Sequence, residues 1–107
     1  MNNLKNYQAD KDLLRGRVVL ITGAGQGIGR AAAIAYATYG ATVILHGRKV
    51  EKLERVYDDI QALGREEAII FPFDFEKALE KDFQAIADAI ASQLGRLDGI
   101  LHNAAFT

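Results

Sequence analysis

The stretch Thr22-Gly23-Ala24-Gly25-Gln26-Gly27-Ile28-Gly29 joins two segments of different character. Residues 17–22 (RVVLIT) before it form a short run rich in β-branched residues, as a buried parallel strand does. Residues 28–39 after it are dense in alanine and end at Gly40, where the glycine that follows a helix is expected. The sequence therefore predicts a strand, a glycine-rich loop and a helix in direct succession.

The same alternation continues along the rest of the sequence. Further strands are predicted from the apolar runs at residues 41–46, 68–73 and 97–101. Between them, apolar residues three or four positions apart predict helices at residues 50–63 and 79–94, each followed by a glycine. Strands that alternate with helices of this length indicate right-handed crossovers and a parallel sheet.

We therefore expect an α/β fold of Rossmann type, a doubly wound parallel sheet with helices on both faces. In the order 3-2-1-4 the third strand is an edge strand, where Pro72 removes no needed hydrogen bond. Residues 1–14 are interpreted as a polar N-terminal arm, and residues 15–107 as a dinucleotide-binding domain that is incomplete at its C-terminal side. The fourth strand would then be the last and would present an open apolar edge, so we expect the cofactor-binding half of a longer protein.

Composition argues against several classes of function. Hydrophobic residues at 50% and charged residues at 25% are typical of an ordinary globular chain with a packed core. The formal net charge of -1 provides no bulk attraction for nucleic acid or for an anionic membrane surface. The absence of cysteine removes thiol nucleophiles, disulfides and cysteine zinc sites. No apolar run reaches the roughly 18 residues that span a bilayer, and we expect a cytoplasmic protein.

The glycine-rich loop has the properties of a phosphate-binding turn. Gly23 permits a tight turn, Gly27 lets the backbone approach a phosphate, and Gly29 lets the helix pack onto the strand. Backbone N–H groups at the positive end of the helix would then face a pyrophosphate. A glycine-rich turn without a ligand is the plainer alternative, but the position between a buried strand and an alanine-rich helix favours nucleotide binding. The other candidate residues of the loop are Thr22, Gly25, Gln26 and Ile28.

The end of the second strand indicates which nucleotide is bound. About 20 residues after the loop, an Asp or Glu would bind the ribose 2′-hydroxyl of NAD. This sequence instead has His46-Gly47-Arg48-Lys49 at that place. With no carboxylate present and with Arg48 able to pair with a 2′-phosphate, NADP is favoured over NAD. A solvated charge pair at the start of a helix remains the alternative interpretation of Arg48 and Lys49.

Taken together, these motifs resemble those of the short-chain dehydrogenase/reductase family. Its glycine motif, Thr-Gly-x-x-x-Gly-x-Gly, is matched at residues 22–29. The family has an Asp near the adenine after the third strand, which Asp74 matches, and Asn-Asn-Ala-Gly after the fourth. That second motif is His102-Asn103-Ala104-Ala105 here, so His102 and Ala105 depart from it. The resemblance spans residues 13–106, and residues 40–45, 47–48 and 96–104 are similar to bacterial YciK-type oxidoreductases.

The resemblance implies hydride transfer between NADP(H) and a small carbonyl or alcohol substrate, in a protein that forms homo-oligomers when intact. It adds Asp74, Asn103, Ala104 and Ala105 to the candidate cofactor contacts. The Ser, Tyr and Lys that catalyse the reaction in this family follow the Asn-Asn-Ala-Gly motif. No catalytic residue is therefore assigned in these 107 residues, and the chain by itself is expected to be inactive.

Other interpretations are weaker. A stand-alone nucleotide-binding module without catalysis is the main alternative, whereas the missing acid after the second strand argues against a methyltransferase. Tyr7 and Lys11 repeat the family's Tyr-x-x-x-Lys spacing but precede the first strand, so we interpret them as a coincidence. His46 and His102 each close a strand without a nearby set of metal ligands, and we expect packing and hydrogen bonding from them and no metal.

Overall fold

The computed structural model describes residues 11–72 and 80–102. Each predicted strand and helix is present, with small shifts at its ends. None of the helices in these two ranges is long and apolar enough to cross a membrane. In chain order the elements are β1 (Val18–Thr22), α2 (Gly27–Thr38), β2 (Thr42–Gly47), α3 (Val50–Gln61), β3 (Ile69–Pro72), α4 (Glu80–Leu94) and β4 (Gly99–Leu101).

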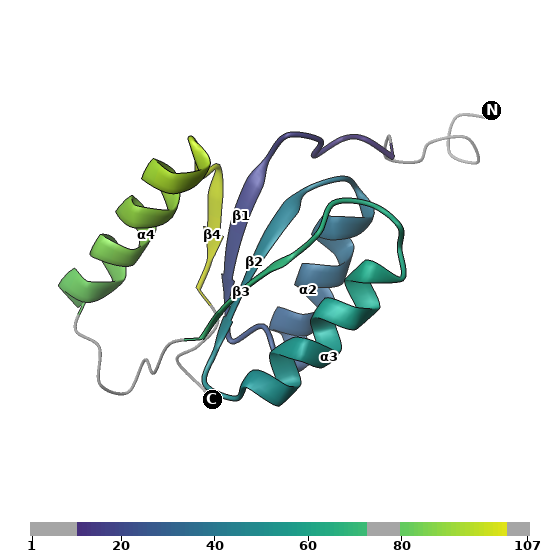
Figure 1. The fold of residues 1–107 in the computed structure, drawn as a ribbon, viewed down its shortest axis with the longest axis horizontal. Helices are drawn as coiled ribbons and strands as arrows, with labels where there is room; N and C mark the ends of the chain where they lie inside the picture. Colours follow the sequence, from purple (N-terminus) through teal and green to yellow (C-terminus); the bar gives the residue numbers. More distant parts are fainter. Residues whose placement is uncertain (1–10, 73–79, 103–107) are drawn as a thin grey trace, which may run out of the picture.

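The four strands form one parallel sheet in the order β3-β2-β1-β4, which confirms the predicted topology (Figure 1). Helices α2 and α3 lie on one face of this sheet and α4 lies on the other (Figure 1). That arrangement follows from right-handed crossovers, because β1 to β2 to β3 advances in one direction and β3 to β4 returns in the opposite one. The doubly wound architecture is therefore established by four strands.

The central strands are buried on both faces, which explains their continuous apolar sequences. All five residues of β1 are buried. Alternate side chains of β1 and β2 point to opposite faces, so Ile21 and Leu45 pack with α2 and α3, whereas Leu20 and Ile44 pack with Ile90 of α4. The helices thus divide the apolar residues of the sheet into two cores.

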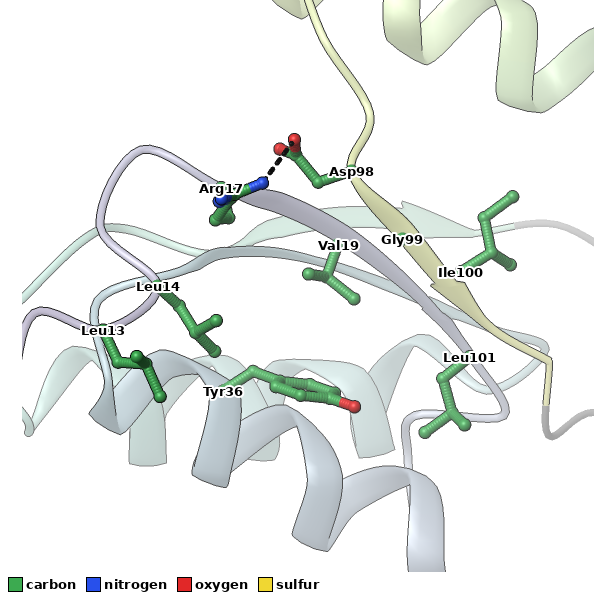
Figure 2. Close-up of a pocket in the computed structure, with 9 residues that line it drawn as sticks. All are labelled: Leu13, Leu14, Arg17, Val19, Tyr36, Asp98, Gly99, Ile100 and Leu101. Atoms are coloured by element: carbon green, nitrogen blue, oxygen red, sulfur yellow. Dashed lines mark ion pairs between the residues drawn. The ribbon is translucent and has the colours of Figure 1, made fainter. Parts of the chain in front are cut away.

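Among the described residues, the two outer strands differ in how they end the sheet. Strand β3 pairs only with β2, and Pro72 lies opposite Gly47, so the proline occupies the edge position that the topology predicts. Strand β4 is the other edge, and the Ile100 side chain is 43% exposed. A groove of about 520 Å³ lies between β4 and the segment before β1 (Figure 2). Its apolar lining includes Leu14, Tyr36 and Leu101.

The segment before β1 is fastened at the amino end of the sheet. The Leu14 N–H donates a 2.8 Å hydrogen bond to the Tyr39 carbonyl at the end of α2. The Arg65 guanidinium donates to the carbonyl oxygens of Lys11 at 2.7 Å and Thr38 at 3.0 Å, and it also pairs with Asp12. These contacts lie at the end of the sheet opposite the glycine-rich loop.

Candidate functional site

The carboxyl ends of the strands meet at one edge of the sheet, where ligands bind in doubly wound folds. Thr22 at the end of β1 lies beside His46 of β2 in the strand register. The Thr22 hydroxyl donates to the Leu101 carbonyl at 3.3 Å, and its oxygen lies 3.3 Å from Nδ1 of His102. Thr22 is fully buried. Its hydroxyl links the end of β1 to the end of β4 at the point where the loop begins.

The glycine-rich loop leaves β1 through two turns that need glycine. Gly23 has φ 62° and Gly27 has φ 59°, in the left-handed region that side chains with a Cβ rarely adopt. The Ala24 N–H donates a 3.0 Å hydrogen bond to the His46 carbonyl, which fixes the loop to β2. A Cβ added at Gly27 would meet nothing within 4 Å, so side chains do not cover the loop at this point.

The start of α2 offers hydrogen-bond donors to a ligand. No side chain caps this helix end, and the first N–H groups of a helix have no partner within it. No acidic residue lies in its first turn, so the positive end of the helix is not neutralised there. Ile28 is 73% exposed next to these donors, whereas Gly29 is buried and faces the sheet. These donors fit the chemistry of a pyrophosphate.

Helix α3 packs closely against this loop. A Cβ at Gly25 would lie 2.9 Å from Cβ of Lys52, and one at Gly47 would lie 3.1 Å from Cδ2 of Leu53. Both glycines therefore make room for the first turn of α3. The Lys52 ammonium donates a hydrogen bond to the side-chain oxygen of Gln26. Lys52 lies outside every motif of the sequence, but a lysine in the first turn of a helix, where acids are favoured, is a signal that could have identified it.

Cations gather after β2, where an NAD-binding carboxylate would lie. Arg48 and Lys49 are exposed, and Lys49 is the N-cap residue of α3. The acidic residue in the first turn of this helix is Glu51. Arg48 follows directly after the carboxyl end of β2, and its role toward a cofactor stays a prediction.

The two histidines differ in environment. His46 is 2% exposed, and burial together with the nearby His102 lowers its pKa to about 4, so its ring is neutral at pH 7. His102 is exposed and contacts the Thr22 hydroxyl. Within residues 11–72 and 80–102, no three His, Asp or Glu side chains gather in a way that could hold a metal ion. In the structure the His46 ring is packed in the interior, and His102 has a hydrogen-bonding contact with Thr22.

The structure brings most of the predicted cofactor residues together at this edge. They are Thr22, Gly23, Gly25, Gln26, Gly27, Ile28, Gly29 and Arg48. Four other predicted contacts lie outside the described residues, namely Asp74, Asn103, Ala104 and Ala105. Tyr7 of the coincidental Tyr-x-x-x-Lys pattern lies outside them as well.

Comparisons with known proteins agree with this arrangement. The family model for short chain dehydrogenases matches residues 17–107. The oxidoreductase YciK of Escherichia coli K12 is 46% identical over 99 residues, which are 92% of this chain and 39% of that protein. The expected similarity to YciK-type oxidoreductases is thereby confirmed.

Solved structures extend the likeness to three dimensions. A short chain dehydrogenase of Shigella flexneri 2a, complexed with NADP, has a TM-score of 0.79 and 45% identity, over 89% of this chain and 40% of that one. One from Escherichia coli CFT073, complexed with NADPH, has a TM-score of 0.77 and 49% identity, again over 89% and 40%. This chain therefore spans about two fifths of the length of these relatives. It belongs to the short-chain dehydrogenase family.

Proposed function

We propose that this chain is the NADP-binding portion of an oxidoreductase that transfers a hydride between the nicotinamide and a carbonyl or alcohol substrate. The observation that carries the proposal is the glycine-rich loop, open at Gly27, at the sheet end where Arg48 stands in place of an NAD-binding carboxylate. The relatives solved with NADP and NADPH support the same cofactor.

In this proposal each part of the edge has a separate task. The N–H groups at the start of α2 bind the pyrophosphate, because they are aligned donors at a positive helix end. The Arg48 guanidinium pairs with the 2′-phosphate through two parallel hydrogen bonds. Thr22 and Ala24 hold the loop on β4 and β2, so its donors keep their direction before the ligand arrives. The bound nicotinamide supplies or accepts the hydride.

Direct titration of the purified chain with NADPH and NADH tests the cofactor assignment. We expect NADPH to bind at least about tenfold more tightly, which is the size of effect expected from one charge-assisted bidentate contact. Replacing Arg48→Gln should remove most of this preference. Arg55→Gln, which removes the same charge two turns further along, should leave the preference intact. Tighter binding of NADH than of NADPH would contradict the assignment.

Turnover requires a separate test on the protein from its native source. We expect that protein to oxidise NADPH in the presence of carbonyl compounds, as a member of this family. A native protein that binds NADPH with the expected preference but turns over no compound in a broad carbonyl and alcohol panel would instead be a nucleotide-binding module. The two experiments therefore separate cofactor binding from catalysis.

A further inference from the structure

Lys52 occupies a particular position relative to the glycine-rich loop. Its stem lies across Gly25, since a Cβ at that glycine would be 2.9 Å from Cβ and 3.7 Å from Cδ of the lysine. Its ammonium group continues to the loop and donates a hydrogen bond to the Gln26 side chain. Gln26 immediately precedes the first residue of α2, so a positive charge is held beside the proposed pyrophosphate donors.

The hydrogen-bond partner of Lys52 at the loop is a neutral side chain. An amide oxygen accepts the hydrogen bond, whereas a carboxylate would also neutralise the ammonium. Lys52 lies in the first turn of α3, where the helix dipole disfavours a cation. Arg48 and Lys49 add two more cations directly before that turn. Such an arrangement becomes favourable when an anion lies close to it.

The first turn of α3 contacts both halves of the proposed site. Lys52 lies over Gly25 in the loop, and the next residue, Leu53, lies over Gly47 at the end of β2. The ammonium of Lys52 is thereby held at the loop, while the residue after it packs against the segment that leads to Arg48. A ribose 2′-phosphate bound to Arg48 would lie on this side of the loop.

We propose that Lys52 is a second cationic ligand of the 2′-phosphate and that it helps to select NADP over NAD. The inference rests on the proposed function and assigns a specificity-determining role to a residue outside the glycine motif. Gln26 holds the ammonium over the loop, and the phosphate replaces or joins this amide as its partner. Arg48 and Lys52 then approach the phosphate from two different elements, the end of β2 and the first turn of α3.

The test measures nucleotide binding without catalysis. Calorimetric titration of the purified chain with adenosine 2′,5′-bisphosphate and with adenosine 5′-monophosphate isolates the contribution of the 2′-phosphate. We expect Lys52→Gln to weaken bisphosphate binding about tenfold, as the loss of a charge-assisted contact does, and to leave monophosphate binding within about twofold. Lys52→Arg should restore most of the bisphosphate affinity because the cation is kept.

A matched control removes the same charge at the other end of the sheet. Lys11 is exposed in the turn before β1, and its carbonyl oxygen, not its side chain, accepts the bond from Arg65. Lys11→Gln should therefore change neither affinity. Thermal melting of each variant shows that the comparison is made on folded protein.

The outcomes distinguish the inference from the proposed function. If Arg48→Gln lowers bisphosphate affinity and Lys52→Gln does not, the proposed function stands and the role of Lys52 is overturned. Equal losses for both nucleotides in Lys52→Gln also overturn it, because they show that the lysine only braces the loop. A wild-type chain that does not distinguish the two nucleotides removes the NADP assignment itself, and the inference with it.

Discussion

On the two sides of β1, the half of the sheet formed by β2 and β3 and the half formed by β4 are packed differently. On the first, Leu53, Val56 and Ile60 of α3 and the alanines of α2 close over β1 and β2 with almost no exposure. On the second, none of the three residues of β4 belongs to the buried set of either core, and Ile100 is exposed. The groove beside β4 lies at this weaker side (Figure 2). The glycine-rich loop is therefore attached to the more deeply buried half, where Ala24 bonds to β2 and α3 packs against the loop.

A second difference concerns how each half is attached to β1. Strand β2 pairs with β1 along five residues, whereas β4 pairs along three. The amino end of β4 is held by Asp98, whose carboxylate accepts a 2.7 Å bond from the Val18 N–H and pairs with Arg96 and Arg17. These contacts of Asp98, here called the polar clamp, supplement the short ladder of β4, whereas apolar packing supports the longer ladder of β2.

The largest effect is expected from a cavity under α3. Leu53 is fully buried and contacts the end of β2, so Leu53→Ala should lower the free energy of unfolding by about 2–5 kcal/mol. Ile100→Ala at the exposed β4 edge should cost less than about 1 kcal/mol, because little buried surface is lost. Urea denaturation measures both. Equal losses would contradict the unequal packing of the two halves.

Protonation of the buried His46 ring, in β2 of the first half, should lower the stability of the fold in mild acid. Its pKa is lowered from 6.5 to about 4, mainly by burial and then by His102, so the folded state takes up its proton later than the unfolded state does. This contribution is fully present above pH 6.5 and falls as the pH drops towards 4, by about 3 kcal/mol at most. Unfolding measured between pH 7 and 4.5 tests this slope.

Two variants separate the causes of this slope. His46→Leu should flatten stability across that interval, because the buried titratable group is gone. His102→Gln should retain most of the slope, since burial is the larger cause. A wild-type protein whose stability does not change between pH 7 and 4.5 would argue against a buried neutral His46.

A smaller effect is expected where α3 meets the loop. Gly25→Ala places a Cβ 2.9 Å from Cβ of Lys52, so α3 or the loop must shift, at a cost of about 1–3 kcal/mol. NADPH binding should weaken as well, since the same shift moves the loop. Gly99→Ala in β4 is the matched control, because a Cβ there meets nothing within 4 Å. The comparison fails if the two variants melt at the same temperature.

The smallest effect is expected at the clamp of β4. Hydrogen bonds from Arg96 and from the Val18 N–H lower the pKa of Asp98 to about 2. A carboxyl with a depressed pKa stabilises the fold above its unfolded pKa of 3.8, and this stabilisation is lost as the pH falls towards 2. Asp98→Asn should therefore reduce the difference in stability between pH 5 and pH 2.

Hydrogen exchange locates that effect within the sheet. In Asp98→Asn the amides of β4 should exchange faster, because the clamp at its amino end is weakened, while those of β2 should keep their protection. Uniformly faster exchange across the sheet would show that the two halves unfold as one unit. The His46 and Asp98 variants thus test the two halves in two separate pH ranges.

Much of the site was accessible from sequence because its signals are local. The glycine motif, the missing carboxylate after β2 and Arg48 all lie within or beside single elements, and the structure places them at one edge. The clamp of Asp98 on Val18 could not be predicted in this way, because 80 positions separate the two residues. The bond between Thr22 and His102 spans the same separation, and only the parallel pairing of β1 with β4 brings them together.

The alternation of strands and helices, the order of the sheet and the place of the glycine-rich loop all followed from the sequence alone. Hydrophobic periodicity, glycine positions and the handedness of crossovers are enough for these features. The contacts of several residues at the loop, in contrast, are known only from the folded chain. The sequence indicates that Gly25 is part of a ligand-binding motif, and the structure adds that it makes room for Lys52 of α3. A glycine in the sequence indicates that space is needed, but the group that occupies the space comes from a distant part of the chain and is known only from the fold.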